Sequence, residues 1–283
     1  MSRFDAERGL YATSPEHGLW HFYEWRDGLS GKGATPGKPD ALYNLYFLEV
    51  LDAFAKTAGD QELQYRADAL RKAVFEAYYN PERGCMMTYD GKPDTHEITQ
   101  VLALYNGCVP ESERQKIVDS VIRKEHVAIS ASSIRYYFAA LVKEGGEARK
   151  FLAEKLWDHF GRMVQGTSTT MWETEIGDED FLKAGSLCHG WSALPIWYFY
   201  ALKLGLNPLS AGWKNFEIAP VEFQGREAFG EVPTPDGTIF LRIRRTDDGL
   251  VLECTGPDTL TPVFRPWAQE EYSSATWNGK SLL

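Results

Sequence analysis

Seven segments before residue 206 carry apolar residues at helical spacing, and they alternate between two kinds. Three are amphipathic and span 61–79, 111–125 and 146–160. Four are apolar nearly all round and span 41–55, 97–105, 133–142 and 186–204. A helix of the second kind is buried on most sides, whereas an amphipathic helix has one face in solvent. The alternation predicts two concentric layers, as in an α/α toroid; a generic helical bundle is the alternative.

After about residue 214 the apolar pattern changes to a period of two. Residues 238–245 alternate apolar and polar side chains, Asp-Asp-Gly at 247–249 is a hairpin-turn signal, and 250–254 resumes the alternation. This predicts a small antiparallel β-sandwich. The fold class is therefore mainly α with a C-terminal all-β domain. We place the toroid-like helical domain and the β-sandwich at 1–212 and 213–283.

Charge and cysteine usage exclude several classes of protein. The chain of 283 residues has 30 Lys and Arg against 40 Asp and Glu, a net charge of −10, whereas nucleic-acid and anionic-membrane surfaces need basic patches. No apolar run approaches the ~20 residues of a membrane span. No secretory signal opens the sequence, so we expect a cytoplasmic protein. The 4 cysteines and 6 histidines are scattered, which predicts reduced thiols and no metal site or cofactor.

Residues with candidate chemistry concentrate in the loops that precede the all-apolar helices. In a toroid these loops meet at one end, where the N-termini of the helices also direct unpaired N–H groups. Acidic and Trp residues at this end of the toroid indicate a neutral polar ligand such as a sugar. The predicted substrate-binding residues in these loops are Glu24, Trp25, Asp27, His96, Trp172 and His189.

The most specific element is the segment 166–175, in which Glu173 follows Trp172 and a run of hydroxyl side chains. A carboxylate that is desolvated on one side and hydrogen-bonded on the other is suited to general acid or base catalysis. His189 lies sixteen residues further on and could contact the same pocket. Alternatively, Glu173 caps a loop and His189 caps a helix. Spacing alone leaves both interpretations open.

Several short motifs occur in order towards the C-terminus. They are Ser-Thr-Thr-Met-Trp-Glu at 168–173, Gly-Ser-Leu-Cys-His at 185–189, Leu-Gly-Leu-Asn-Pro at 204–208 and Phe-Glu-Ile-Ala-Pro at 216–220. Together they resemble the C-terminal half of the catalytic region of glycoside hydrolase family 78, whose members are mostly bacterial and fungal α-L-rhamnosidases. The resemblance implies an (α/α)6 barrel, a closing β-sandwich and inverting hydrolysis of rhamnosides.

The same resemblance implies roles for individual residues. Glu173 matches the family's general base, His189 matches a histidine that contacts the substrate, and Trp25 matches a sugar-stacking tryptophan. The motif of Trp25, at 20–25, resembles the family's aromatic segment ending in Asp-Trp. Glu24 stands where the family usually has Asp.

The sequence also departs from the family. The family's general acid lies in an Asp- and Arg-rich segment upstream of the Trp-Glu motif, and these 283 residues contain no such segment. The helices amount to about seven of the twelve in a barrel. The acid then belongs to a missing N-terminal half or to another carboxylate of this chain. The candidates within the chain are Glu24, Asp27, Glu97 and Glu175.

Two other functions remain open. The chain is either a catalytically inactive, truncated protein that binds a sugar or a partner chain, or another (α/α)6 sugar hydrolase such as an unsaturated uronyl hydrolase. The latter needs a basic pocket for its uronate, and the site predicted here is acidic. An incomplete barrel also exposes the apolar flanks of helices such as 41–55, which favours a homo-oligomer or a complex with the missing half.

Overall fold

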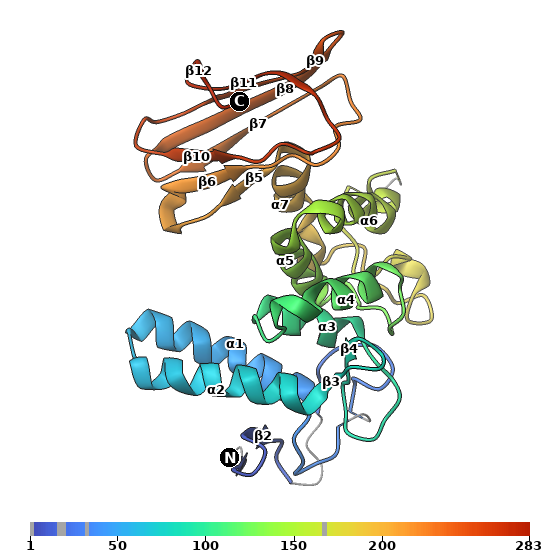
Figure 1. The fold of residues 1–283 in the computed structure, drawn as a ribbon. Helices are drawn as coiled ribbons and strands as arrows, with labels where there is room; N and C mark the ends of the chain where they lie inside the picture. Colours follow the sequence, from blue (N-terminus) through green and yellow to red (C-terminus); the bar gives the residue numbers. More distant parts are fainter. Residues whose placement is uncertain (1–2, 16–20, 32–33, 166–168) are drawn as a thin grey trace. The chain divides into compact units, whose positions relative to one another are not determined.

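The computed structural model describes residues 3–15, 21–31, 34–165 and 169–283 (Figure 1). These residues divide into two compact units. The first unit runs up to Lys143 and includes Glu179–Gly185, and the second comprises Glu144–Asp178 and Ser186–Leu283. The expected combination of a mainly helical chain with a C-terminal β region is confirmed: seven α-helices precede most of the strands in the described part of the chain.

The first unit holds the first five helices, close to where the hydrophobic periodicity predicts them. They are α1 (Ala41–Ala58), α2 (Gln61–Tyr78), α3 (Glu97–Tyr105), α4 (Glu111–Ile122) and α5 (Ile134–Glu144). Four short strands accompany them in two hairpins: β1 (Arg3–Asp5) with β2 (Leu10–Ala12), and β3 (Tyr79–Asn80) with β4 (Cys85–Met86). Helix α3 is buried along nearly its whole length, as its all-apolar sequence predicts.

Helix α1 begins and ends as its flanking residues dictate. The Asp40 side chain caps it by accepting a hydrogen bond from the N–H of Tyr43, and Gly59 ends it in the left-handed conformation. Its first half is buried, but Val50 and Phe54 in the second half are 65% and 62% exposed. An all-apolar helix therefore keeps one flank uncovered within the described residues.

The second unit begins with α6 (Gly146–Gln165), again as predicted. The single helix expected over 186–204 is wrong. This segment contains a 3₁₀ turn (Gly190–Ala193), α7 (Pro195–Tyr198) and a π-helical turn (Phe199–Leu204). Helical structure starts only at Gly190, because His189 is extended and the backbone of Ser186 and His189 bonds to segment 171–173. Pro195 begins α7, where its missing N–H costs no hydrogen bond.

The rest of the second unit is built from two sheets. The three-stranded sheet has the order β10-β6-β5 and the five-stranded sheet the order β12-β11-β9-β8-β7. The strands are β5 (Leu206–Pro208), β6 (Asn215–Ile218), β7 (Glu227–Thr234), β8 (Gly237–Thr246), β9 (Gly249–Thr255), β10 (Thr261–Phe264), β11 (Tyr272–Trp277) and β12 (Lys280–Ser281). The predicted hairpin at 247–249 joins β8 to β9. Pairing is mixed, because β6–β10 and β9–β11 are parallel whereas the other pairs are antiparallel.

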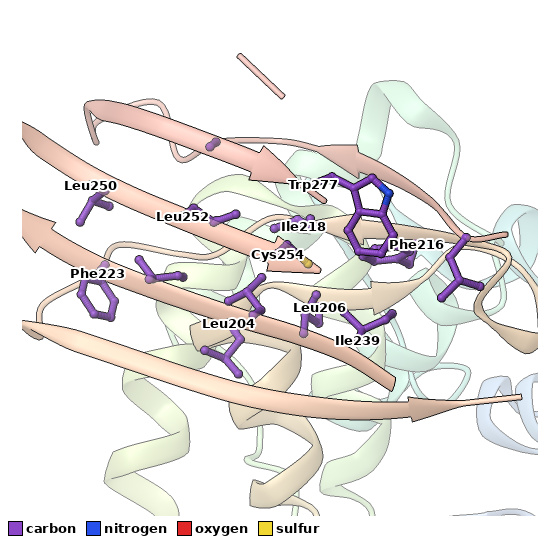
Figure 2. Packing of buried hydrophobic residues seen from close by; sticks show 14 residues of the cluster. Leu204, Leu206, Phe216, Ile218, Phe223, Ile239, Leu250, Leu252, Cys254 and Trp277 are labelled. Atoms are coloured by element: carbon purple, nitrogen blue, oxygen red, sulfur yellow. The ribbon is translucent and has the colours of Figure 1, made fainter. Parts of the chain in front are cut away.

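Both sheets contribute to one hydrophobic core (Figure 2). Phe216 of β6 lies against Trp277 of β11 with ring centroids 5.4 Å apart, and Ile239 and Leu252 fill the same cluster from β8 and β9. A buried carboxylate adds a polar link: Glu217 of β6 accepts a hydrogen bond from Arg149 of α6 at 2.7 Å. The sheets and α6 are therefore tied together within the second unit.

In the part of the chain that the structure describes, no helix combines the length and apolar character needed to cross a membrane.

Candidate functional site

Two segments of the second unit pair to form the frame around Glu173. The backbone N–H of Glu173 donates to the carbonyl of Ser186 at 2.8 Å, and the N–H of His189 donates to the carbonyl of Met171 at 2.8 Å. The Thr170 hydroxyl also donates to the carbonyl of Leu187. This pairing brings the two predicted motifs, sixteen residues apart, side by side.

The carboxylate of Glu173 is half-buried and held through one of its oxygens. Oε2 accepts the N–H of Ser186 at 3.1 Å. The indole N–H of Trp191 donates to the backbone carbonyl of Glu173 at 2.8 Å, which fixes the chain beneath the side chain. Among the described residues nothing donates to Oε1, so that oxygen can accept a proton from a water or a substrate hydroxyl.

Aromatic rings flank this carboxylate. His189 stacks on Trp191 with ring centroids 3.5 Å apart and an angle of 21° between the planes. Trp172 packs over Gly177, whose φ is +62° and where an added Cβ would lie 2.8 Å from the indole ring. Only glycine fits there without displacing Trp172.

Three polar atoms beside Glu173 are buried and have no hydrogen-bond partner within the described parts of the chain. They are Nε1 of Trp172, Oγ1 of Thr174 and Nδ1 of His189. Unpaired buried polar groups are rare in folded proteins and cost free energy. Their grouping around a carboxylate is typical of a site that a polar ligand completes.

Helix α6 contacts the segment 172–175, which carries Glu173. Nδ1 of His159 lies 2.6 Å from Oε1 of Glu175, and the N–H of Trp172 donates to the sulfur of Met163 at 3.4 Å. Residues on each side of Glu173 therefore contact α6.

Three other predicted residues meet in the first unit. Glu24 is fully buried, and its two oxygens accept the backbone N–H groups of Arg26 and Ser130. His96 is also buried, with Nε2 3.1 Å from the carbonyl of Asp27 and Nδ1 2.9 Å from the Thr88 hydroxyl. This pattern assigns a neutral imidazole that donates from Nε2, in keeping with burial lowering the pKa of His96.

Trp25 is exposed, unlike the adjacent Glu24, which is fully buried. It is 52% exposed, and its ring packs edge-on against Phe22 at 4.8 Å. An exposed indole of this kind can stack on a sugar ring. Trp20, at the start of the same motif, lies outside the described residues, as does Ser168 of the Trp-Glu motif.

The carboxylates considered as in-chain acids differ in their surroundings. Glu24 and Glu97 are buried and accept backbone N–H groups, in the case of Glu97 that of Ile129 at 2.8 Å. Asp27 is exposed, and Glu175 contacts His159. Backbone N–H groups therefore occupy oxygens of both Glu24 and Glu97, which suits a structural role.

Sequence reasoning missed one titratable pair in the first unit. The Tyr23 hydroxyl donates to the Asp40 carboxylate at 2.7 Å, and burial raises the pKa of Asp40 to about 6. The only signal was the place of Asp40 immediately before an apolar helix, which marks a helix cap. Within the described residues no three His, Cys, Asp or Glu side chains group as metal ligands.

With this geometry in place, the chain has a fold shared with part of the α-L-rhamnosidases. A glycoside hydrolase family 78 rhamnosidase from Bacillus sp. GL1 matches with a TM-score of 0.77 and 23% identity over 97% of this chain and 30% of that protein. The resemblance inferred from the motifs is thus confirmed at the level of the fold. The chain spans less than a third of that protein's length.

Two further structures extend the comparison. The α-L-rhamnosidase of Streptomyces avermitilis, solved with L-rhamnose, matches with a TM-score of 0.64 and 21% identity over 82% of this chain and 23% of its own. The rhamnosidase of Klebsiella oxytoca, solved with rhamnose bound, matches with a TM-score of 0.53 and 19% identity over 70% of this chain and 38% of its own. No family model and no curated protein matches the sequence.

Proposed function

We propose that this chain is an α-L-rhamnosidase-like glycoside hydrolase that removes terminal α-L-rhamnosyl residues with inversion. One observation carries the proposal: the Glu173 carboxylate is fixed through Oε2 and open at Oε1, beside the stacked rings of His189 and Trp191. The fold shared with rhamnosidases supports the choice of sugar.

In this mechanism Glu173 is the general base. Its Oε1 accepts a proton from a water molecule as that water attacks the anomeric carbon from the face opposite the leaving oxygen. Nε1 of Trp172 and Nδ1 of His189, which lack a partner among the described residues, are the donors or acceptors that we expect to bond sugar hydroxyls. The single displacement inverts the anomeric configuration.

The general acid comes from polypeptide outside these 283 residues. Two of the in-chain candidates, Glu24 and Glu97, are buried and accept backbone N–H groups, so neither is free to approach a leaving oxygen. In inverting enzymes the acid lies roughly 6.5–9.5 Å from the base. Without it, hydrolysis depends on how readily the leaving group departs unprotonated.

The dependence on the leaving group supplies the test. The chain should hydrolyse dinitrophenyl α-L-rhamnoside, whose phenolate needs no protonation, and should leave methyl α-L-rhamnoside intact. Glu173→Gln should abolish the hydrolysis and keep L-rhamnose binding, whereas Asp178→Asn, on an exposed residue of the same loop, should change neither. Absence of both binding and hydrolysis in the wild type would refute the proposal.

A non-catalytic role is the second candidate, favoured by the uncovered flank of α1. Val50 and Phe54 form an exposed apolar surface that a second copy or the remaining barrel helices would cover. Sedimentation of the chain alone should then show dimers or larger species. Hydrolysis abolished by Glu173→Gln would exclude this role as the sole function.

A further inference from the structure

His159 and Glu175 form a contact that the mechanism above does not use. His159 lies on α6 and is only 5% exposed, whereas Glu175 is half-exposed two residues after Glu173. Nδ1 of the imidazole and Oε1 of the carboxylate are 2.6 Å apart. The imidazole ring also packs edge-on against Phe160 at 4.5 Å, so its orientation is fixed by the helix.

A second contact from the same face of α6 reaches the other side of the base. Met163 follows His159 by four residues and is therefore on the same face of the helix. Its sulfur accepts the N–H of Trp172. The segment that carries Glu173 is thus attached to α6 immediately before and two residues after the carboxylate.

Helix α6 is itself attached to the β-sheets of the second unit. Arg149, near its start, bonds to the buried Glu217 of β6. Segment 186–191 contacts Glu173 itself, through the bonds of Ser186 and Trp191. The contacts from α6 are made to other residues, Trp172 and Glu175, so they add a second set of attachments to the segment.

We infer that His159 is a positioning residue: it binds the carboxylate of Glu175 and thereby fixes the position and orientation of the Glu173 carboxylate. The inference rests on the proposed function. It also gives Glu175 a role in anchoring instead of acid catalysis. Misplacing a reacting group by about 1 Å costs around 100-fold in rate, so a lost anchor should show mainly in kcat.

Three variants test whether the contact between His159 and Glu175 matters, as distinct from the packing of the His159 ring. His159→Phe keeps a ring against Phe160 and removes the donor, Glu175→Ala removes the acceptor, and Glu175→Gln restores a neutral acceptor. Asp178→Asn is the matched control in the same loop. Glu175 is half-exposed, so its variants should fold, and far-UV circular dichroism checks this.

For hydrolysis of dinitrophenyl α-L-rhamnoside we expect His159→Phe and Glu175→Ala each to lower kcat at least about tenfold with KM nearly unchanged. The double variant should be no slower than either single one. Glu175→Gln should recover most of the rate. Unchanged kcat in folded His159→Phe or Glu175→Ala, or additive losses in the double variant, would overturn the inference.

Backbone hydrogen exchange of peptides covering 170–175 gives a readout without substrate. Exchange there should rise at least about tenfold in Glu175→Ala and stay unchanged in Asp178→Asn. If the wild type neither binds nor cleaves a rhamnoside, the proposed function fails, and this exchange measurement still decides whether His159 anchors the segment. Equal exchange in wild type and Glu175→Ala would refute the anchor.

Discussion

Arg149 of α6 donates a hydrogen bond to Glu217 of β6 at 2.7 Å, and both side chains are largely buried. Arg265 binds the other oxygen of Glu217 at 2.7 Å. A buried carboxylate with two guanidinium partners is expensive to disrupt, because removing it takes the carboxylate away from the largely buried Arg149. This contact joins the helix that supports Glu173 to the β-sheets of the same unit.

Glu217→Ala should therefore lower the free energy of unfolding by about 3–5 kcal/mol, as is usual when one partner of a buried ion pair is removed. Urea denaturation at pH 7.5 measures the change. Glu222→Ala is the matched control, because Glu222 pairs with Lys150 at 3.2 Å on the surface and its loss should be hard to detect. Equal stability of the two variants would contradict a stabilising role for the buried network.

The contribution of His126 to stability should fall as the pH drops from about 6.5 towards 4. Burial lowers its pKa to about 4, so the unfolded chain binds more protons than the folded one in this interval. Nε2 of the ring donates to the Ser120 hydroxyl, which itself donates to the carbonyl of Ile117, and Nδ1 lies 2.8 Å from the Thr95 hydroxyl. After discounting for its partial exposure, the loss is about 2 kcal/mol.

His126→Asn isolates this contribution in urea denaturation at pH 7.5 and pH 4.5. The variant should be less stable than the wild type at pH 7.5, and the difference should shrink at pH 4.5. The comparison with a variant is needed because Asp40, with its pKa raised to about 6, gains a proton on folding and has the opposite pH dependence. A difference independent of pH would contradict the assignment.

Gly177→Ala should displace Trp172 and weaken sugar binding. The added methyl would meet the indole at 2.8 Å at a φ of +62°. Gly145→Ala is the control, because Gly145 has a similar φ of +71° and open space around it, so it carries the backbone strain without the clash. L-Rhamnose titration should show at least about a fivefold weaker affinity for Gly177→Ala alone. Equal affinities would place Trp172 outside the binding site.

Trp191→Phe should keep an aromatic ring over His189 and remove the hydrogen bond to the carbonyl of Glu173. A net hydrogen bond is worth about 1 kcal/mol, so L-rhamnose affinity should fall a few-fold. Trp157→Phe, on the exposed face of α6, serves as the control and should leave the titration unchanged. Identical affinity in both variants would show that Trp191 does not position Glu173.

The hydrophobic periodicity and the turn residues predicted those helices and hairpins that depend on residues close together in the sequence. The apolar segment 41–55 became Ala41–Ala58, and the Asp-Asp-Gly turn joined β8 to β9. The segment 186–204 did not form one helix, because its first residues pair with 171–173, and that contact depends on tertiary structure. Periodicity shows which side chains are buried but does not show which backbone groups find partners elsewhere.

The candidate site was predictable only where a motif marked it. Trp172, Glu173 and His189 do lie together in the second unit, and Glu24, Asp27 and His96 do in the first. His159 gave no signal, because one histidine on the apolar face of an amphipathic helix looks like any core residue. Its importance depends on Glu175 reaching it from outside the helix, which spacing does not reveal.

The pairing of β5 with β6 has a practical consequence for dissecting the chain. Leu206 and Pro208 lie opposite Ile218 and Phe216. A fragment cut at residue 213, where the sequence pattern changes, would lack β5 and leave β6 as a bare apolar edge, the kind of strand that recruits other chains into aggregates. A recombinant form of the β region should therefore start ahead of Leu206, so that β6 keeps its neighbour on each side.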